Sequence, residues 1–182
     1  WCPTRIGDGD EDQWGGSLVC HRMLFNADGT IDLKLPDGID KKFTTLKKTV
    51  LIDKSGKAVK KEDSYVLSDV ASVSFPRLDK TCKIEATVKA TGNDDAFGFA
   101  FGACDDKTEV YSIRFDLKNK QLVMSKDDLT RGTTPTQTNV ALTVPADKLF
   151  KVKIVAEKSV CVMYVNDKIA FSNRIDKMPK NP

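Results

Sequence analysis

Aspartates are plentiful in this sequence, and many gather where the chain is expected to turn. The pairs Asp94-Asp95 and Asp105-Asp106 flank the apolar run 96–103. Glycoside hydrolysis needs two carboxylates held at a fixed separation. Turn propensity already explains aspartates at these places, because the side chain hydrogen-bonds to its own backbone. We therefore predict no catalytic residue among them.

Calcium is the one metal that these acidic pairs suggest. Ca²⁺ takes about six to eight oxygen ligands, and Asp94, Asp95, Asp105 and Asp106 all offer carboxylate oxygens. One strand separates the pairs and tends to place them at opposite ends, and plain hairpin turns explain them equally well. We keep calcium at these four residues as a secondary expectation and expect no other cofactor.

Nucleophilic and metal chemistry based on histidine or cysteine is not supported. The single histidine, His21, follows Cys20, and neighbours in a strand point to opposite faces. We expect His21 to be structural. The five cysteines show no C-x-x-C spacing, and the odd number leaves at least one unpaired within the chain. The glycines are isolated, so no phosphate-binding loop is indicated.

Exposed aromatic rings are the residues that could hold a sugar, since they stack on its apolar face. The exposed candidates are Trp1, Trp14 and Tyr111. Tyr65 and Tyr164 fit the strand pattern better as partly buried residues. We predict carbohydrate contact at the first three.

Composition excludes several classes of protein. The chain has 182 residues, a net charge of +3 with both signs interspersed, and 40% hydrophobic residues. The lysine runs lack accompanying exposed aromatics, so we expect no nucleic-acid binding. No run of 18 apolar residues occurs, and we expect no membrane span. The start at Trp1 suggests that a leader has been removed or that the chain is a piece of something longer.

Alternation of apolar and polar residues is the main structural signal. It predicts strands in the second half of the chain, at 70–75, 82–90, 96–103, 109–116, 121–125, 139–144, 150–157, 160–166 and 168–173. Short Asn-, Asp- and Gly-containing turns join them, and no helix is indicated. The sequence therefore predicts an all-β fold, a two-layer antiparallel β-sandwich, with a closed barrel as the weaker alternative.

The first part of the chain has a different pattern. Residues 16–25 and 30–35 read as a hairpin, and the lysine-rich segment 43–62 reads as a surface connection. We divide the chain into an N-terminal hairpin unit at 1–45 and a β-sandwich domain at 46–182. The hairpin is interpreted as the remnant of another domain or as strands added to the sandwich.

Residues Trp14-Gly15-Gly16-Ser17-Leu18-Val19-Cys20-His21-Arg22-Met23 resemble the end of the catalytic β-propeller in glycoside hydrolase family 32, the invertase, levanase and inulinase group. That family typically has W-x-G-x-L-S-x-P-R-E there. The tryptophan, glycine, leucine and arginine match, whereas His21 stands at the usual proline and Met23 at the usual glutamate.

The C-terminal half is similar to the second domain of that family, a β-sandwich of the concanavalin A-like lectin/glucanase (jelly-roll) type. Tyr164-Val165-Asn166 matches an aromatic-x-Asn strand end, and Phe171-Ser172-Asn173-Arg174 matches the returning strand. Val162 stands where the family often has glutamate. The runs 97–102 and 111–116 follow the same order, and the resemblance spans residues 14–175.

The family's catalytic motifs, W-x-N-D-P-N-G, R-D-P and E-C, do not occur in this sequence. The resemblance therefore implies a non-catalytic accessory domain of a glycosidase acting on fructan- or sucrose-type carbohydrates. Its implied partners are the parent's catalytic propeller and an oligo- or polysaccharide. It also implies a secreted, periplasmic or cell-surface location. The alternatives are a stand-alone lectin-like carbohydrate-binding module and, ranked last, a complete enzyme of unfamiliar type.

Overall fold

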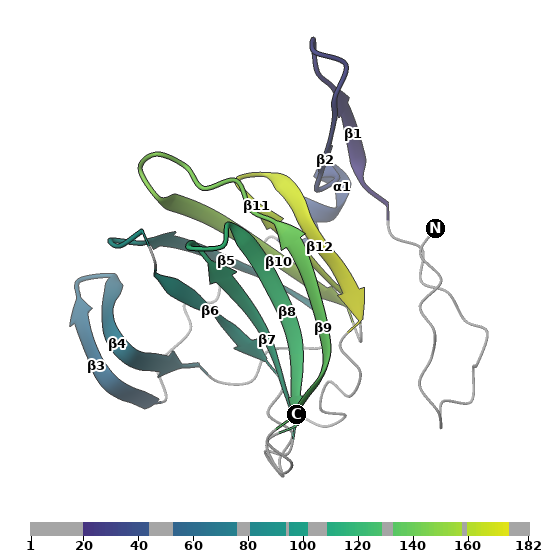
Figure 1. The fold of residues 1–182 in the computed structure, drawn as a ribbon. Helices are drawn as coiled ribbons and strands as arrows, with labels where there is room; N and C mark the ends of the chain where they lie inside the picture. The colour runs from purple at the N-terminus through teal and green to yellow at the C-terminus, as the bar shows by residue number, and fades with distance from the viewer. Residues whose placement is uncertain are drawn as a thin grey trace, which may run out of the picture.

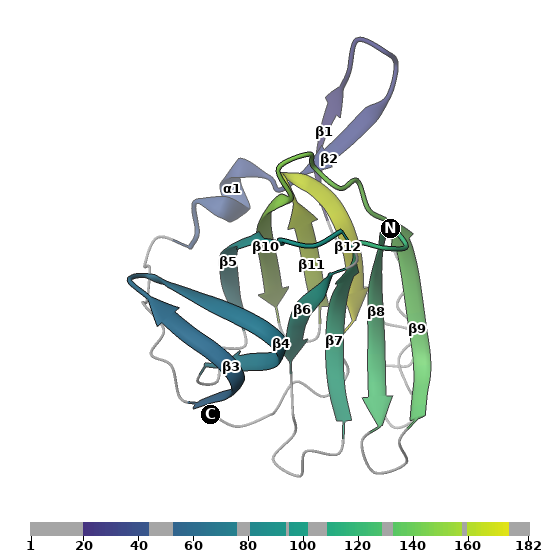
Figure 2. The same cartoon turned by 60° about the vertical axis from the view of Figure 1, so that its left-hand side comes forward.

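Eight strands in two antiparallel sheets form the body of the protein. The computed structural model describes residues 20–43, 53–75, 81–93, 95–101, 109–128, 133–157 and 160–174. The eight strands are β5 (Thr81–Lys89), β6 (Ala96–Phe101), β7 (Glu109–Asp116), β8 (Gln121–Asp128), β9 (Thr133–Ala141), β10 (Leu149–Glu157), β11 (Val160–Val165) and β12 (Lys168–Arg174). They form one sheet of order β12-β11-β10-β5, here called the β10 sheet, and one of order β6-β7-β8-β9, the β7 sheet. The two sheets lie face to face (Figures 1 and 2), which confirms the predicted two-layer β-sandwich.

Aromatic side chains at alternate strand positions fill the space between the sheets. Phe115 of β7 and Phe150 of β10 are completely buried. Their ring centroids lie 5.4 Å apart, and Phe97 of β6 stacks on Phe115 at 4.5 Å. The contact between Phe115 and Phe150 joins the two sheets, because β7 belongs to one and β10 to the other. The strand alternation read from the sequence thus specifies the core directly.

Strand β11 departs from this alternation, since both of its faces are covered. Cys161 and Met163 belong to the core between the sheets. Val162 and Tyr164 point to the opposite face, yet they are only 6% and 2% exposed. A second layer of chain must therefore cover the outer face of the β10 sheet at β11.

Part of that cover is the N-terminal segment, which comprises β1 (Arg22–Phe25), β2 (Ile31–Lys34) and the short helix α1 (Asp37–Asp40). The His21 Nδ1 atom lies 3.1 Å from the Tyr164 hydroxyl. Two ion pairs connect the same segment to the β10 sheet, Asp40 with Lys83 at 2.7 Å and Asp32 with Lys168 at 3.0 Å. The β1–β2 hairpin itself extends beyond the sandwich (Figure 1). The division of the chain at residue 45 stays a prediction.

A further hairpin occupies the region expected to be a surface connection, so that expectation is wrong for residues 53–61. Among the described strands, β3 (Asp53–Lys61) and β4 (Ser64–Ser74) pair only with each other. Gly56 has φ +65°, and a Cβ there would overlap the Val70 carbonyl oxygen. The pairing register shifts at this point, and such a bulge bends a hairpin.

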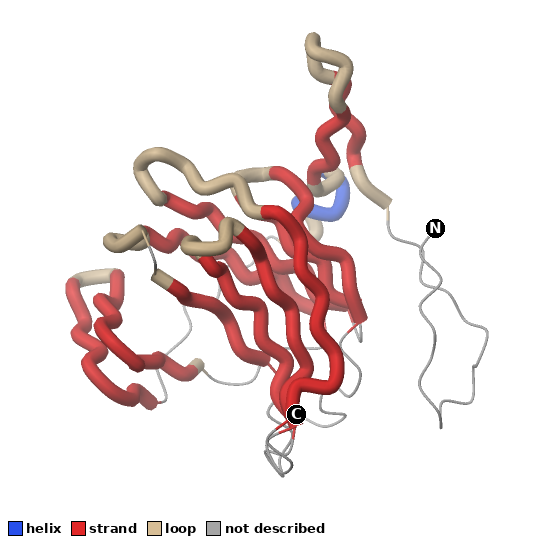
Figure 3. Tube along the Cα trace, viewed as in Figure 1, coloured by secondary structure: helices blue, strands red, loops and turns tan. Residues whose placement is uncertain are grey.

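The bend folds β4 back on itself. The rings of Tyr65 and Phe75, near its two ends, meet edge to face with centroids 6.4 Å apart. Figure 3 shows the resulting hook beside the sandwich.

In the described part of the chain, no helix is long and apolar enough to cross a membrane.

Candidate functional site: a hollow on the outer face of the β10 sheet

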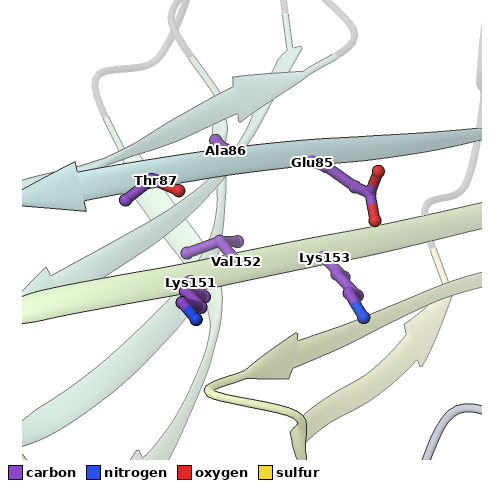
Figure 4. A pocket seen from close by; sticks show the side chains of 6 residues that line it. All are labelled: Glu85, Ala86, Thr87, Lys151, Val152 and Lys153. Carbon is purple, nitrogen blue, oxygen red and sulfur yellow. The ribbon is translucent and has the colours of Figure 1, made fainter. Parts of the chain in front are cut away.

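An open hollow of about 230 Å³ lies on the outer face of the β10 sheet, across β5 and β10. Because Val152 and Ile154 face the core, Lys151 and Lys153 point outward. The strand register pairs Lys151 with Thr87 and Lys153 with Glu85. Figure 4 shows these four side chains around the hollow, which we call the strand hollow.

A second hollow of about 420 Å³ adjoins the first at the end of the sheet. We call it the turn hollow, since it lies at two chain turns; its lining residues are Pro145, Asp147, Leu149, Lys151, Asn166 and Asp167. Asn166 and Asp167 have φ angles of +50° and +64°, as expected for the two central residues of a tight hairpin turn. The predicted turn between β11 and β12 is thus confirmed, and it also forms one wall of a hollow.

Hydrogen bonds fix this turn against β10. The Asn166 backbone N–H donates to the Lys151 carbonyl at 2.8 Å, and the Lys151 N–H donates to the Asn166 side-chain oxygen at 2.9 Å. On the other side, the Asp147 carboxylate accepts the Leu149 N–H at 3.1 Å. The walls of the turn hollow are therefore held in place by the backbone.

Ion pairs organise the charges around the strand hollow. Lys153 pairs with Asp167 at 3.0 Å, and Glu85 lies 3.3 Å from Lys83. Burial lowers the pKa of Lys83, but its hydrogen bonds to Asp40 and Glu85 outweigh burial, so the net pKa is raised. The Lys83 hydrogen bond holds the pKa of Asp40 below its usual range.

The Lys151 ammonium differs from these charges. Among the residues that the structure describes, no carboxylate forms an ion pair with it. The strand hollow thus combines ammonium donors, a carboxylate acceptor and the Thr87 hydroxyl. This set suits a ligand with many hydroxyl groups.

Tyr111, expected to be exposed, lies in the core with 5% of its surface accessible, so this expectation is wrong. The cause is strand parity, since Tyr111 shares a face with Ile113 and Phe115. A buried ring cannot stack on a sugar. Trp1 and Trp14 lie outside the described residues.

Of the four expected calcium ligands, only Asp95 lies within the described residues; Asp94, Asp105 and Asp106 do not. The Asp95 carboxylate accepts the backbone N–H groups of Thr91 at 3.1 Å and Gly92 at 2.6 Å. It therefore shapes the turn before β6. Within the described ranges, no three His, Cys, Asp or Glu side chains gather as a metal site. Calcium at these residues stays a prediction.

His21 takes a structural position. Burial lowers its pKa, and burial also raises the pKa of its neighbour Tyr164 to about 12. Both groups are therefore neutral near pH 7, which allows a hydrogen bond between them. Cys20 is an exposed free thiol and Cys161 a buried one, while Cys82 is partly buried.

The hollows were not predicted from the residue types, because lysine and glutamate in a strand are ordinarily interpreted as solvent-exposed side chains. The alternation in 150–154 does place Lys151 and Lys153 on one outer face. Nothing in the sequence places β5 beside β10, which are about 60 residues apart along the chain.

Comparison with known proteins gives two findings. The family model described as "GH32, BT1760-like, C-terminal domain" matches residues 29–182. The solved carbohydrate-binding module CBM66 from Bacillus subtilis is similar in fold, with a TM-score of 0.53 and 14% identity, over 69% of this chain and 78% of that chain. No curated protein matches.

Proposed function

The chain belongs to the BT1760-like family of glycoside hydrolase family 32 C-terminal domains, and we propose that it is a non-catalytic, carbohydrate-binding accessory domain. The family match carries this proposal, because the matching model describes a C-terminal domain of glycoside hydrolase family 32. The similar solved structure, CBM66, is itself a carbohydrate-binding module. We also propose that the parent protein is a glycosidase that acts on fructan- or sucrose-type carbohydrates.

The strand hollow is the proposed glycan site. Sugar hydroxyls both donate and accept hydrogen bonds, and Lys151, Lys153, Glu85 and Thr87 supply both kinds of partner. The ion pair with Asp167 holds the Lys153 ammonium in position before ligand arrives. A positioned donor loses less conformational freedom on binding than a free lysine does.

The β1–β2 hairpin is the proposed contact with the parent's catalytic propeller. Met23, Phe25 and Ile31 are 51%, 76% and 48% exposed. The register opposes Phe25 to Ile31 and Met23 to Leu33, which puts these apolar side chains on one face. An exposed apolar face of this kind favours a covering partner. In this proposal residues 1–45 are the end of the propeller and 46–182 the concanavalin A-like sandwich, in a secreted, periplasmic or cell-surface protein.

Calorimetric titration tests the glycan site. We expect heat of binding with fructose, sucrose or oligosaccharides from levan or inulin. Lys153→Met keeps the aliphatic stem but removes charge-assisted hydrogen bonds worth about 1.5–3 kcal/mol, a loss of roughly 10- to 100-fold in affinity. The control is Lys118→Met, since Lys118 is exposed and lines neither hollow. Absence of heat with every sugar would refute glycan binding.

A stand-alone lectin-like module is the second candidate, supported by the fold shared with the carbohydrate-binding module CBM66. The two candidates differ in the role of the hairpin. In an accessory domain, Phe25→Ala destabilises the parent protein that carries the propeller. If the chain is instead a stand-alone module, the same substitution has little effect on the stability of any longer protein that contains it.

A further inference from the structure

Lys151 lines both hollows on the outer face of the β10 sheet. Resting on the glycan-binding function proposed above, we infer that the ligand is an oligosaccharide whose adjacent sugar units occupy the strand hollow and the turn hollow, with the Lys151 ammonium at the linkage between them. The turn hollow is then a second subsite. It sets a preference for chain length.

The size of the hollows favours two units. Small-molecule pockets usually begin at roughly 300 Å³, and the strand hollow alone measures about 230 Å³. The adjoining turn hollow measures about 420 Å³. A single sugar would leave one of the two adjoining hollows empty, whereas two linked units would fill both.

The turn hollow has the chemistry of a sugar subsite. Pro145 and Leu149 offer an apolar surface to the C–H groups of a ring. The Asp147 Oδ1 atom accepts the Leu149 N–H, and the Asn166 Oδ1 atom accepts the Lys151 N–H. These bonds leave the Asp147 Oδ2 atom as an acceptor and the Asn166 amide nitrogen as a donor, both oriented by the backbone.

Lys151 is suited to the position between the subsites. Its backbone carbonyl and its backbone N–H are both hydrogen-bonded to Asn166. Its ammonium forms no ion pair with a described residue. A lysine ammonium carries three N–H donors. It can therefore donate to hydroxyls of two neighbouring sugar units at once.

Titration with saccharides of increasing length tests the inference, using fructose, sucrose and levan- or inulin-derived tri- and tetrasaccharides. We expect at least one oligosaccharide to bind about tenfold or more tightly than fructose, the gain from roughly one to two added hydrogen bonds. Lys151→Met should weaken binding of both the oligosaccharide and fructose. Lys118→Met is again the matched control.

Asp147→Asn separates the two subsites. It keeps an oxygen for the Leu149 N–H, so the turn should fold, and it replaces the charged Oδ2 acceptor with an NH2 donor. We expect a roughly three- to tenfold loss for the oligosaccharide and none for fructose. Equal affinities for fructose and all oligosaccharides, or an equal loss for both with Asp147→Asn, would overturn the two-subsite inference while leaving glycan binding intact. Failure of every sugar to bind would instead remove the proposed function.

Discussion

Truncation of Phe150 to alanine tests whether the two sheets are held together by the aromatic core. The side chain is completely buried, with ring centroids 5.4 Å from Phe115 and 5.5 Å from Phe97. Removing a buried phenylalanine costs about 3–5 kcal/mol, because burial is lost and a cavity remains. That is a large fraction of the roughly 5–15 kcal/mol by which a domain is stable.

The matched control is Phe25→Ala, the same chemical change at a side chain that is 76% exposed. We expect it to change the free energy of unfolding by less than about 0.5 kcal/mol, as at most surface positions. Urea denaturation followed by circular dichroism measures both variants. For a domain of this size the Phe150 variant should melt roughly 6–20 °C lower, at about 2–4 °C per kcal/mol. A loss below about 1 kcal/mol for Phe150→Ala, or equal losses for the two variants, would show that the core assignment is wrong.

Three further predictions concern the N-terminal segment, the hooked hairpin and the thiols. Burial lowers the pKa of His21 in the folded state. Its contribution to stability is therefore complete above about pH 6.5, the pKa of an ordinary histidine. This contribution is lost as the pH falls from about 6.5 toward the lower pKa of the folded state. Melting temperatures from pH 8 to 5 should show this loss, and His21→Gln should flatten it; identical profiles would contradict it. Gly56→Ala should cost about 1–3 kcal/mol, since a Cβ meets the Val70 carbonyl oxygen, and more than Gly29→Ala, where φ is also positive but no atom lies within 4 Å; chemical denaturation compares the two. Burial raises the pKa of Cys161 to about 12, so a thiol reagent at pH 8 should label exposed Cys20 first and Cys161 only after unfolding; equal labelling by mass spectrometry would contradict this.

The second-half strands could be predicted because apolar residues alternate there and Asn-Asp turns separate them. The hairpin of β3 and β4 was not predicted, apart from the strand at 70–75 that overlaps the end of β4, because both of its faces are largely exposed and so impose little alternation. The bulge at Gly56, which bends it, depends on contact with Val70 of the partner strand. The prediction that Tyr111 is exposed was wrong, even though the sequence shows that it lies on the same face of its strand as Ile113 and Phe115.

The candidate site was predictable only in its parts. The alternation of 150–154 puts Lys151 and Lys153 on one side of a strand, and Asn166-Asp167 is recognisable as a turn. The complete site depends on long-range pairing, because β10 lies between its neighbour in sequence, β11, and the distant strand β5. The hydrogen bonds between Lys151 and Asn166 then place the turn beside the lysines.

The sequence alone determined that this protein is an antiparallel β-sandwich, because side-chain period and turn chemistry are local properties of the chain. Only the tertiary structure decided which outward-facing residues lie together in a hollow, since a strand's neighbours are set by long-range pairing. It also decided that Tyr164 is buried on the outer face, because the N-terminal segment contacts it there through His21. Local pattern thus specifies the two layers, and packing between distant segments creates the surface that can bind a ligand.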